Sequence, residues 1–124
     1  MKLLQYAIGG IIVIEGIDKY LNLLADWKDY AAWQLVSIAP ITMGQFLAVL
    51  GVVEIIVGLV FLLRPSIGGW LVAGLMLGII INLLILGKYY NLITLNVIVG
   101  LAALSVSQAK QRHDLIPPKL TTDR

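Results

Sequence analysis

The sequence predicts an all-α fold, namely an integral membrane, antiparallel four-helix bundle with a short interfacial helix between its first two helices. Hydrophobic residues make up 60% of the 124 positions and charged residues only 13%. The mean hydropathy of +0.94 is too high for a water-soluble domain of this size to hide its apolar surface. The apolar residues also form long runs that lack the two-residue alternation of membrane β-strands.

Four of these runs are long enough to cross a bilayer as helices, which takes about 20 residues for a core of about 30 Å. Arg64-Pro65 separates the second run from the third, because proline disfavours helical geometry in the residue before it. Gly87-Lys88 begins the hairpin between the third and fourth runs. Both connections are short, so neighbouring helices should be antiparallel. The predicted spans are 3–24, 43–63, 67–87 and 90–108, within one transmembrane domain of residues 1–108.

The connection between the first two runs contains a shorter apolar stretch, Ala31 to Ala39, which cannot span a membrane. We predict an interfacial helix over 30–38, with Trp27, Tyr30 and Trp33 at the level of the lipid headgroups. A second interpretation also fits, in which the stretch extends the second spanning helix and Pro40 produces a kink.

Lysine and arginine residues are unequally divided between the two predicted sides of the membrane. One side carries Lys2, Arg64, Lys110, Arg112, Lys119 and Arg124, and the other carries Lys19, Lys28 and Lys88. Positive residues favour the cytoplasmic side, which predicts a multi-pass protein of a bacterial or archaeal plasma (inner) membrane with both termini in the cytoplasm. Residues 109–124 are then a polar cytoplasmic tail, in which Pro117-Pro118 prevents further helix.

Polar side chains occur at depths where they are costly. A charge near the bilayer centre costs about 2.5 to 3.5 kcal/mol on insertion scales, so such residues normally face the bundle interior and have partners. Glu54 lies near the middle of its run, and Glu15 lies in the second half of the first run. We predict one buried polar cluster, a candidate ligand or proton site, formed by Glu15, Asp18, Lys19, Gln45, Glu54, Asn82 and Asn96.

Two interpretations of this cluster are open. In the structural one, Glu54 and Lys19 form a buried ion pair that fixes helix register, and Asn82 and Asn96 form a hydrogen bond between helices. In the functional one, neighbouring carboxyl groups share a proton or bind a ligand.

Glycine spacing predicts where helices approach each other closely. Gly51 and Gly58 are seven residues apart in the second run, and Gly74 and Gly78 form a GxxxG motif in the third. We expect packing within the chain at all four positions, although a GxxxG motif also fits a partner helix from another chain.

Several classes of chemistry are excluded by composition. The chain has no cysteine and a single histidine, which removes thiolate metal sites and a haem held by two histidines. The sequence therefore predicts no metal site and no cofactor bound by the chain itself, although contact with a quinone or lipid is compatible with it. A formal charge of +2 is too small for a nucleic-acid binder.

Two stretches, separated by a loop rich in aromatic residues, form a recognisable pattern: Gly16-Ile17-Asp18-Lys19-Tyr20 and Gly51-Val52-Val53-Glu54-Ile55-Ile56-Val57-Gly58-Leu59. This pattern resembles that of the DoxX-like family of small membrane proteins. Members look like four-helix bundles with a Gly-x-x-Lys at the end of the first helix and a Glu followed by a Gly four residues later in the second. Lys19 and Glu54 match those positions, whereas Glu15 stands where a histidine or similar polar residue is common.

The resemblance implies an accessory role in a respiratory or redox complex, because relatives look like partners of redox enzymes, and the related DoxD group resembles a subunit of a thiosulfate to quinone oxidoreductase. We therefore expect a membrane accessory subunit, not itself an enzyme, with a quinone-accessible or proton-accessible site. Its partners would be lipids, other membrane or redox subunits, or further copies of itself. A small-solute transporter or permeability protein and a membrane-complex assembly factor are the alternatives.

Overall fold

The computed structural model describes residues 2–115, and this part of the chain is helical with no β-strand. Three helices, α3 (Met43–Leu63), α4 (Pro65–Leu86) and α5 (Tyr90–Leu115), are long and apolar enough to cross a membrane. They indicate a membrane protein. The remaining long helix, α1 (Lys2–Leu21), is less apolar because Glu15, Asp18 and Lys19 all lie in its second half.

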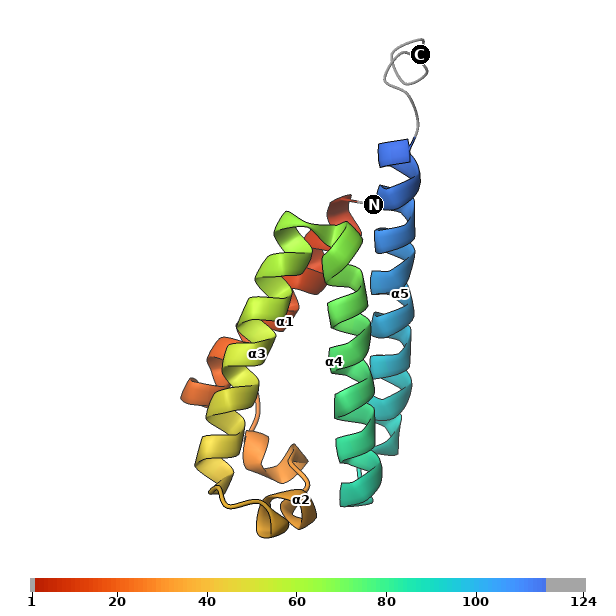
Figure 1. Cartoon of the computed structure of the whole chain (residues 1–124). Helices are drawn as coiled ribbons and strands as arrows, with labels where there is room; N and C mark the ends of the chain where they lie inside the picture. Colours follow the sequence, from red (N-terminus) through yellow and green to blue (C-terminus); the bar gives the residue numbers. More distant parts are fainter. Residues whose placement is uncertain (1, 116–124) are drawn as a thin grey trace.

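The long helices associate as two antiparallel pairs, α1 with α3 and α4 with α5 (Figure 1). The pairs contact each other where α3 turns into α4 at Arg64, and they diverge toward the opposite end. Phe61 packs against the backbone of α4 at Gly68 beside this turn. The buried apolar core lies in the same region and consists of Ile8, Ile12, Val57, Phe61, Val72, Met76, Ala103 and Val106.

Glycines allow the helices of the first pair to approach closely. A Cβ atom on Gly16 would lie 2.7 Å from the carbonyl oxygen of Gly51, and one on Gly58 would lie 2.9 Å from that of Gly9. The predicted packing role of Gly51 and Gly58 is therefore seen at the contact of α1 with α3. In the second pair, Gly69 of α4 lies equally close to α5.

The observed helix ends follow from local capping. The predicted span 43–63 coincides with α3, whose Thr42 and Gln45 form a capping box. α4 begins at Pro65, two residues before the prediction, because proline is well tolerated in the first helical turn, and Gly87 ends it in left-handed geometry (φ 78°). α1 ends at Leu21 instead of residue 24, since Asn22 adopts φ 53° and donates its N–H to the carbonyl of Asp18.

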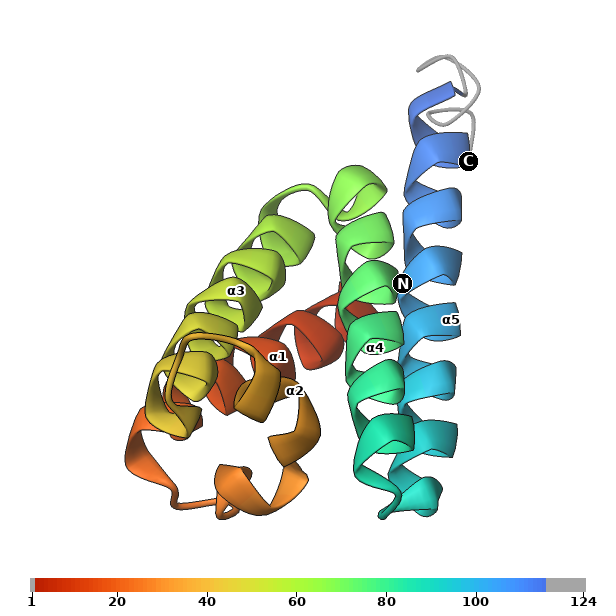
Figure 2. The same ribbon diagram turned by 60° about the horizontal axis from the view of Figure 1, so that its bottom comes forward.

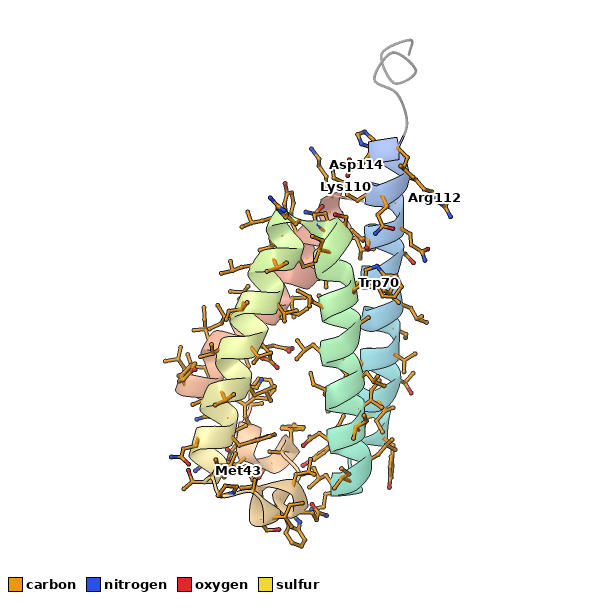
Figure 3. All side chains as sticks on the ribbon, viewed as in Figure 1. Met43, Trp70, Lys110, Arg112 and Asp114 are labelled. Carbon is orange, nitrogen blue, oxygen red and sulfur yellow. The ribbon has the colours of Figure 1, made fainter. Side chains whose placement is uncertain are left out.

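α5 runs to Leu115, beyond the predicted end at residue 108, because no proline or glycine stops it before that point. The first part of the predicted tail is therefore helical, and Pro117-Pro118 lies outside the described residues. Lys110, Arg112 and Asp114 mark this end of α5, opposite Met43 at the start of α3 (Figure 3). Gln111 donates to the carbonyl of Ser66, which places the end of α5 beside the Arg64 turn.

The connecting segment, residues 22–42, folds back between the diverging pairs (Figure 2). The helix predicted over 30–38 is shorter than expected, because α2 covers only Trp33–Ile38. The 3-10 turn η1 (Trp27–Tyr30) precedes it. The extended interpretation, in which this stretch continues the second spanning helix, is wrong because α2 ends at Ile38 and Pro40 lies in a turn before α3.

Candidate functional site

A cavity of about 770 Å³ occupies the wedge between the two helix pairs. We call it the wedge cavity. Its wall is mainly apolar and includes Phe46, Leu50 and Ile79. Residues of α1, α3, α4, α5 and the connecting segment all contribute to it, and it contains five of the seven polar residues predicted to cluster: Glu15, Lys19, Glu54, Asn82 and Asn96.

The centre of the site is an ion pair between α1 and α3. The Nζ atom of Lys19 lies 2.7 Å from Oε2 of Glu54, and each side chain is only 3% exposed. The close approach of Gly16 to Gly51, one turn from these residues, brings the two side chains within reach. The ion pair of the structural interpretation is therefore present, and it also forms part of the cavity wall.

Trp27 joins this ion pair to the connecting segment. The Nζ atom of Lys19 lies 3.8 Å from the centroid of the indole ring, which is cation–π geometry. The indole Nε1 donates to a carboxylate oxygen of Asp18 at 2.9 Å. Trp27 was predicted at the level of the headgroups, and only the fold of the connecting segment places it against Lys19.

Asp18 does not line the wedge cavity. Its carboxylate accepts hydrogen bonds from the backbone N–H groups of Leu23 and Leu24, in addition to the indole of Trp27. All three distances are 2.9 Å, and Asp18 is buried. This corrects its assignment to a ligand cluster, because the carboxylate is used to fix the chain after α1.

Gln45 is also outside the cavity, and its assignment to the buried cluster is wrong. It is exposed at the start of α3, where its Oε1 accepts from the backbone N–H of Thr42 at 2.9 Å. The capping box uses the side chain for the helix end, and helical phase turns it away from the cavity.

Asn82 holds the connecting segment against α4. Its Nδ2 donates to the carbonyl of Tyr30 at 2.6 Å, and its Oδ1 accepts from the N–H of Ala32 at 2.8 Å. Ala32 is fully buried as a result. The hydrogen bond predicted between Asn82 and Asn96 is therefore replaced by one that the sequence did not indicate, since nothing in the spacing showed that the connecting segment would return to α4.

Gly74 and Gly78 line the wedge cavity, and our expectation of packing within the chain is wrong for both. No heavy atom of the described chain lies within 4 Å of a Cβ atom built on either residue. The reason is the divergence of α3 from α4. Near the turn, Phe61 of α3 contacts Gly68 of α4. Two turns further along each helix, Glu54 of α3 and Leu75 of α4 line the cavity.

Two polar side chains of the predicted cluster line the cavity without a bond to the protein. Among residues 2–115, the Glu15 carboxylate and the Asn96 amide have no hydrogen-bond partner, and both residues are half-buried. The arrangement is thus an apolar cavity with one ion pair, in which the carboxylate of Glu15 and the amide of Asn96 are available to a ligand.

The chain was compared with protein-family models, curated proteins and solved structures, and it matches none of them.

Proposed function

We propose that this chain is a DoxX-like accessory subunit of a membrane redox complex, and that its wedge cavity binds a lipid-soluble molecule of the quinone class. The observation that carries this proposal is the cavity itself. About 770 Å³ is within the range of sites for small organic ligands, and an apolar wall with a few convergent polar groups is typical of them. The sequence resemblance at Lys19 and Glu54 concerns two residues of this wall.

The topology that we propose places all four long helices across the membrane as an antiparallel bundle, with the connecting segment at the outer interface. We include α1 among the spanning helices because its charged residues Asp18 and Lys19 are both buried and bonded within the protein, so they need not face lipid. The excess of basic residues at the end that carries Lys2, Arg64 and Lys110 supports cytoplasmic termini. The membrane would be the plasma membrane of a bacterium or archaeon.

Ligand binding can be tested through Trp27, which lines the cavity. The chain has three tryptophans, and replacing Trp33 and Trp70 with phenylalanine leaves Trp27 as the reporter. The protein in lipid nanodiscs is titrated with decylubiquinone, which quenches indole fluorescence on contact. We expect saturable quenching, and its absence would overturn the proposed ligand class.

A cavity-filling variant shows whether the quinone binds in the wedge cavity. Gly78→Leu adds a side chain where no heavy atom lies within 4 Å, so it should fill the cavity without disturbing helix packing. We expect the affinity for the quinone to fall by about 5-fold to 150-fold, since overpacking costs about 1 to 3 kcal/mol. Gly10→Leu is the matched control, because Gly10 is also helical and open but does not line the cavity. Equal affinity of both variants would place the quinone elsewhere.

The accessory role is tested by isolation from the native membrane in mild detergent. An affinity-tagged chain should copurify with redox subunits of the same membrane. Recovery of the tagged chain alone, under conditions in which a known respiratory complex stays intact, would contradict this part of the proposal.

Transport of a small polar solute is the second candidate, and the charged side chains that line the cavity favour it. A transporter should move solute into liposomes without partner subunits, and Glu54→Gln should abolish the flux while circular dichroism shows that the helices are retained.

A further inference from the structure

The wall of the wedge cavity carries more acidic than basic side chains. Glu15 and Glu54 line the cavity, Asp18 is adjacent on α1, and Lys19 is the one cation of the described chain that lines the wall. Two of the acids have fixed partners, since Glu54 is paired with Lys19 and Asp18 accepts three hydrogen bonds. Glu15 is the carboxyl group without one among residues 2–115.

The other walls offer Glu15 no compensating charge. η1 and the elements α4 and α5 contribute Tyr30, Asn82 and Asn96, whose polar groups are a hydroxyl and two amides. Lys19 is four residues from Glu15 on the same helix face, but its ammonium group already donates to Glu54 and lies over the Trp27 ring. A negative charge on Glu15 thus depends on water in the cavity.

A neutral ligand that fills the cavity displaces this water. A carboxylate left in an apolar environment without a partner is several kcal/mol less stable, and such a group takes up a proton instead. We infer that the wedge cavity binds a neutral lipid-soluble ligand together with one proton, which is held by Glu15. This inference rests on the proposed function only in requiring that some neutral molecule enters the cavity.

The experiment measures binding and proton uptake on the same sample. The full chain in weakly buffered nanodiscs, with Trp27 as the single tryptophan, is titrated with decylubiquinone and separately with 1-decanol. A pH indicator reports protons, and Trp27 emission reports binding. We expect close to one proton per bound molecule at a pH where free Glu15 is ionised, and a dissociation constant that rises about tenfold per pH unit there.

Two variants separate Glu15 from other titrating groups. Glu15→Gln removes the acceptor, so binding should persist without proton uptake and without dependence on pH. Glu54→Gln frees Lys19, which can then pair with Glu15 at the favourable four-residue spacing, so proton uptake should also be lost. If Glu15 had only a structural role, the Glu15→Gln variant would take up as many protons per bound ligand as the unmodified chain.

The outcomes separate a failure of the proton-coupling inference from a failure of the quinone proposal. Decylubiquinone binding without proton uptake would overturn the inference and leave the quinone proposal standing. Proton-coupled binding of 1-decanol but no binding of decylubiquinone would support the inference and overturn the quinone proposal. Failure of both probes to bind would overturn both, as the cavity would then not accept neutral ligands. Proton uptake that persists in Glu15→Gln would overturn the inference, because another group would be the acceptor.

Discussion

The buried ion pair is expected to be one of the most sensitive points of the fold, and Lys19→Met tests this directly. The two charged atoms are 2.7 Å apart and each side chain is 3% exposed, so Glu54 would lose its partner in a place that water barely reaches. Breaking a buried pair by removing one member costs about 3 to 5 kcal/mol, mostly because the remaining charge is left uncompensated. We expect the free energy of unfolding of Lys19→Met to fall by about this amount.

Unfolding is measured at equilibrium in mixed micelles of dodecyl maltoside and increasing sodium dodecyl sulfate, followed by tryptophan fluorescence. The double variant Lys19→Met with Glu54→Gln removes both charges and should recover most of the loss, since a buried pair replaced by neutral groups is often close to neutral in stability. Lys110→Met is the matched control. The Lys110–Asp114 pair is separated by 3.2 Å but its side chains are 45% and 54% exposed, so its loss should change stability by less than about 1 kcal/mol.

The reasoning would be refuted if Lys19→Met were no less stable than Lys110→Met. It would also be refuted if the double variant were as unstable as Lys19→Met, because the cost would then come from lost packing of the lysine stem and not from an unpaired carboxylate.

Three further outcomes are expected. Gly58→Ala should destabilise the protein by about 1 to 3 kcal/mol, because the new Cβ atom would lie 2.6 Å from a side-chain atom and 2.9 Å from a carbonyl oxygen of α1. The control Gly10→Ala should be neutral or slightly stabilising, because no heavy atom lies within 4 Å of its new Cβ atom. Equal melting temperatures of the two variants would contradict this prediction. Asn82→Ala should speed amide hydrogen exchange at Ala32, whose N–H loses its acceptor, and unchanged exchange would show that Asn82 does not hold the connecting segment. Gln45→Ala should lower stability by no more than about 1 kcal/mol and leave the quinone affinity reported by Trp27 fluorescence unchanged, since Gln45 caps α3 outside the cavity. A large drop in affinity would show that Gln45 belongs to the binding site.

The ends of the long helices were largely predictable because they depend on local chemistry. Pro65 and Gly87 limit α4 through backbone geometry that acts within a few residues. The end of α1 was missed by three residues because it depends on Asn22 in left-handed geometry and on the side chain of Asp18, and both were within an apolar-looking stretch.

The site was only partly predictable. The spacing of Glu54 and Lys19 along two antiparallel helices allowed the ion pair to be named, because hydrocarbon penalises any charge that does not find a partner. The roles of Asp18, Gln45 and Asn82 were not foreseen. Each of these side chains bonds to backbone groups of the connecting segment or of a helix end, and such contacts have no periodicity in the sequence.

The sequence by itself determined that this chain is helical and apolar enough for a membrane, and which residues must hide their charge, because these properties follow from hydropathy and helix length summed along the chain. Only the tertiary structure decided that Gly74 and Gly78 border a cavity while Gly51 and Gly58 close a helix contact. All four are glycines in apolar helices. What distinguishes them is the angle between two helix pairs, which is set by where the pairs touch at Phe61 and Gly68 and by a connecting segment that keeps them apart at the other end.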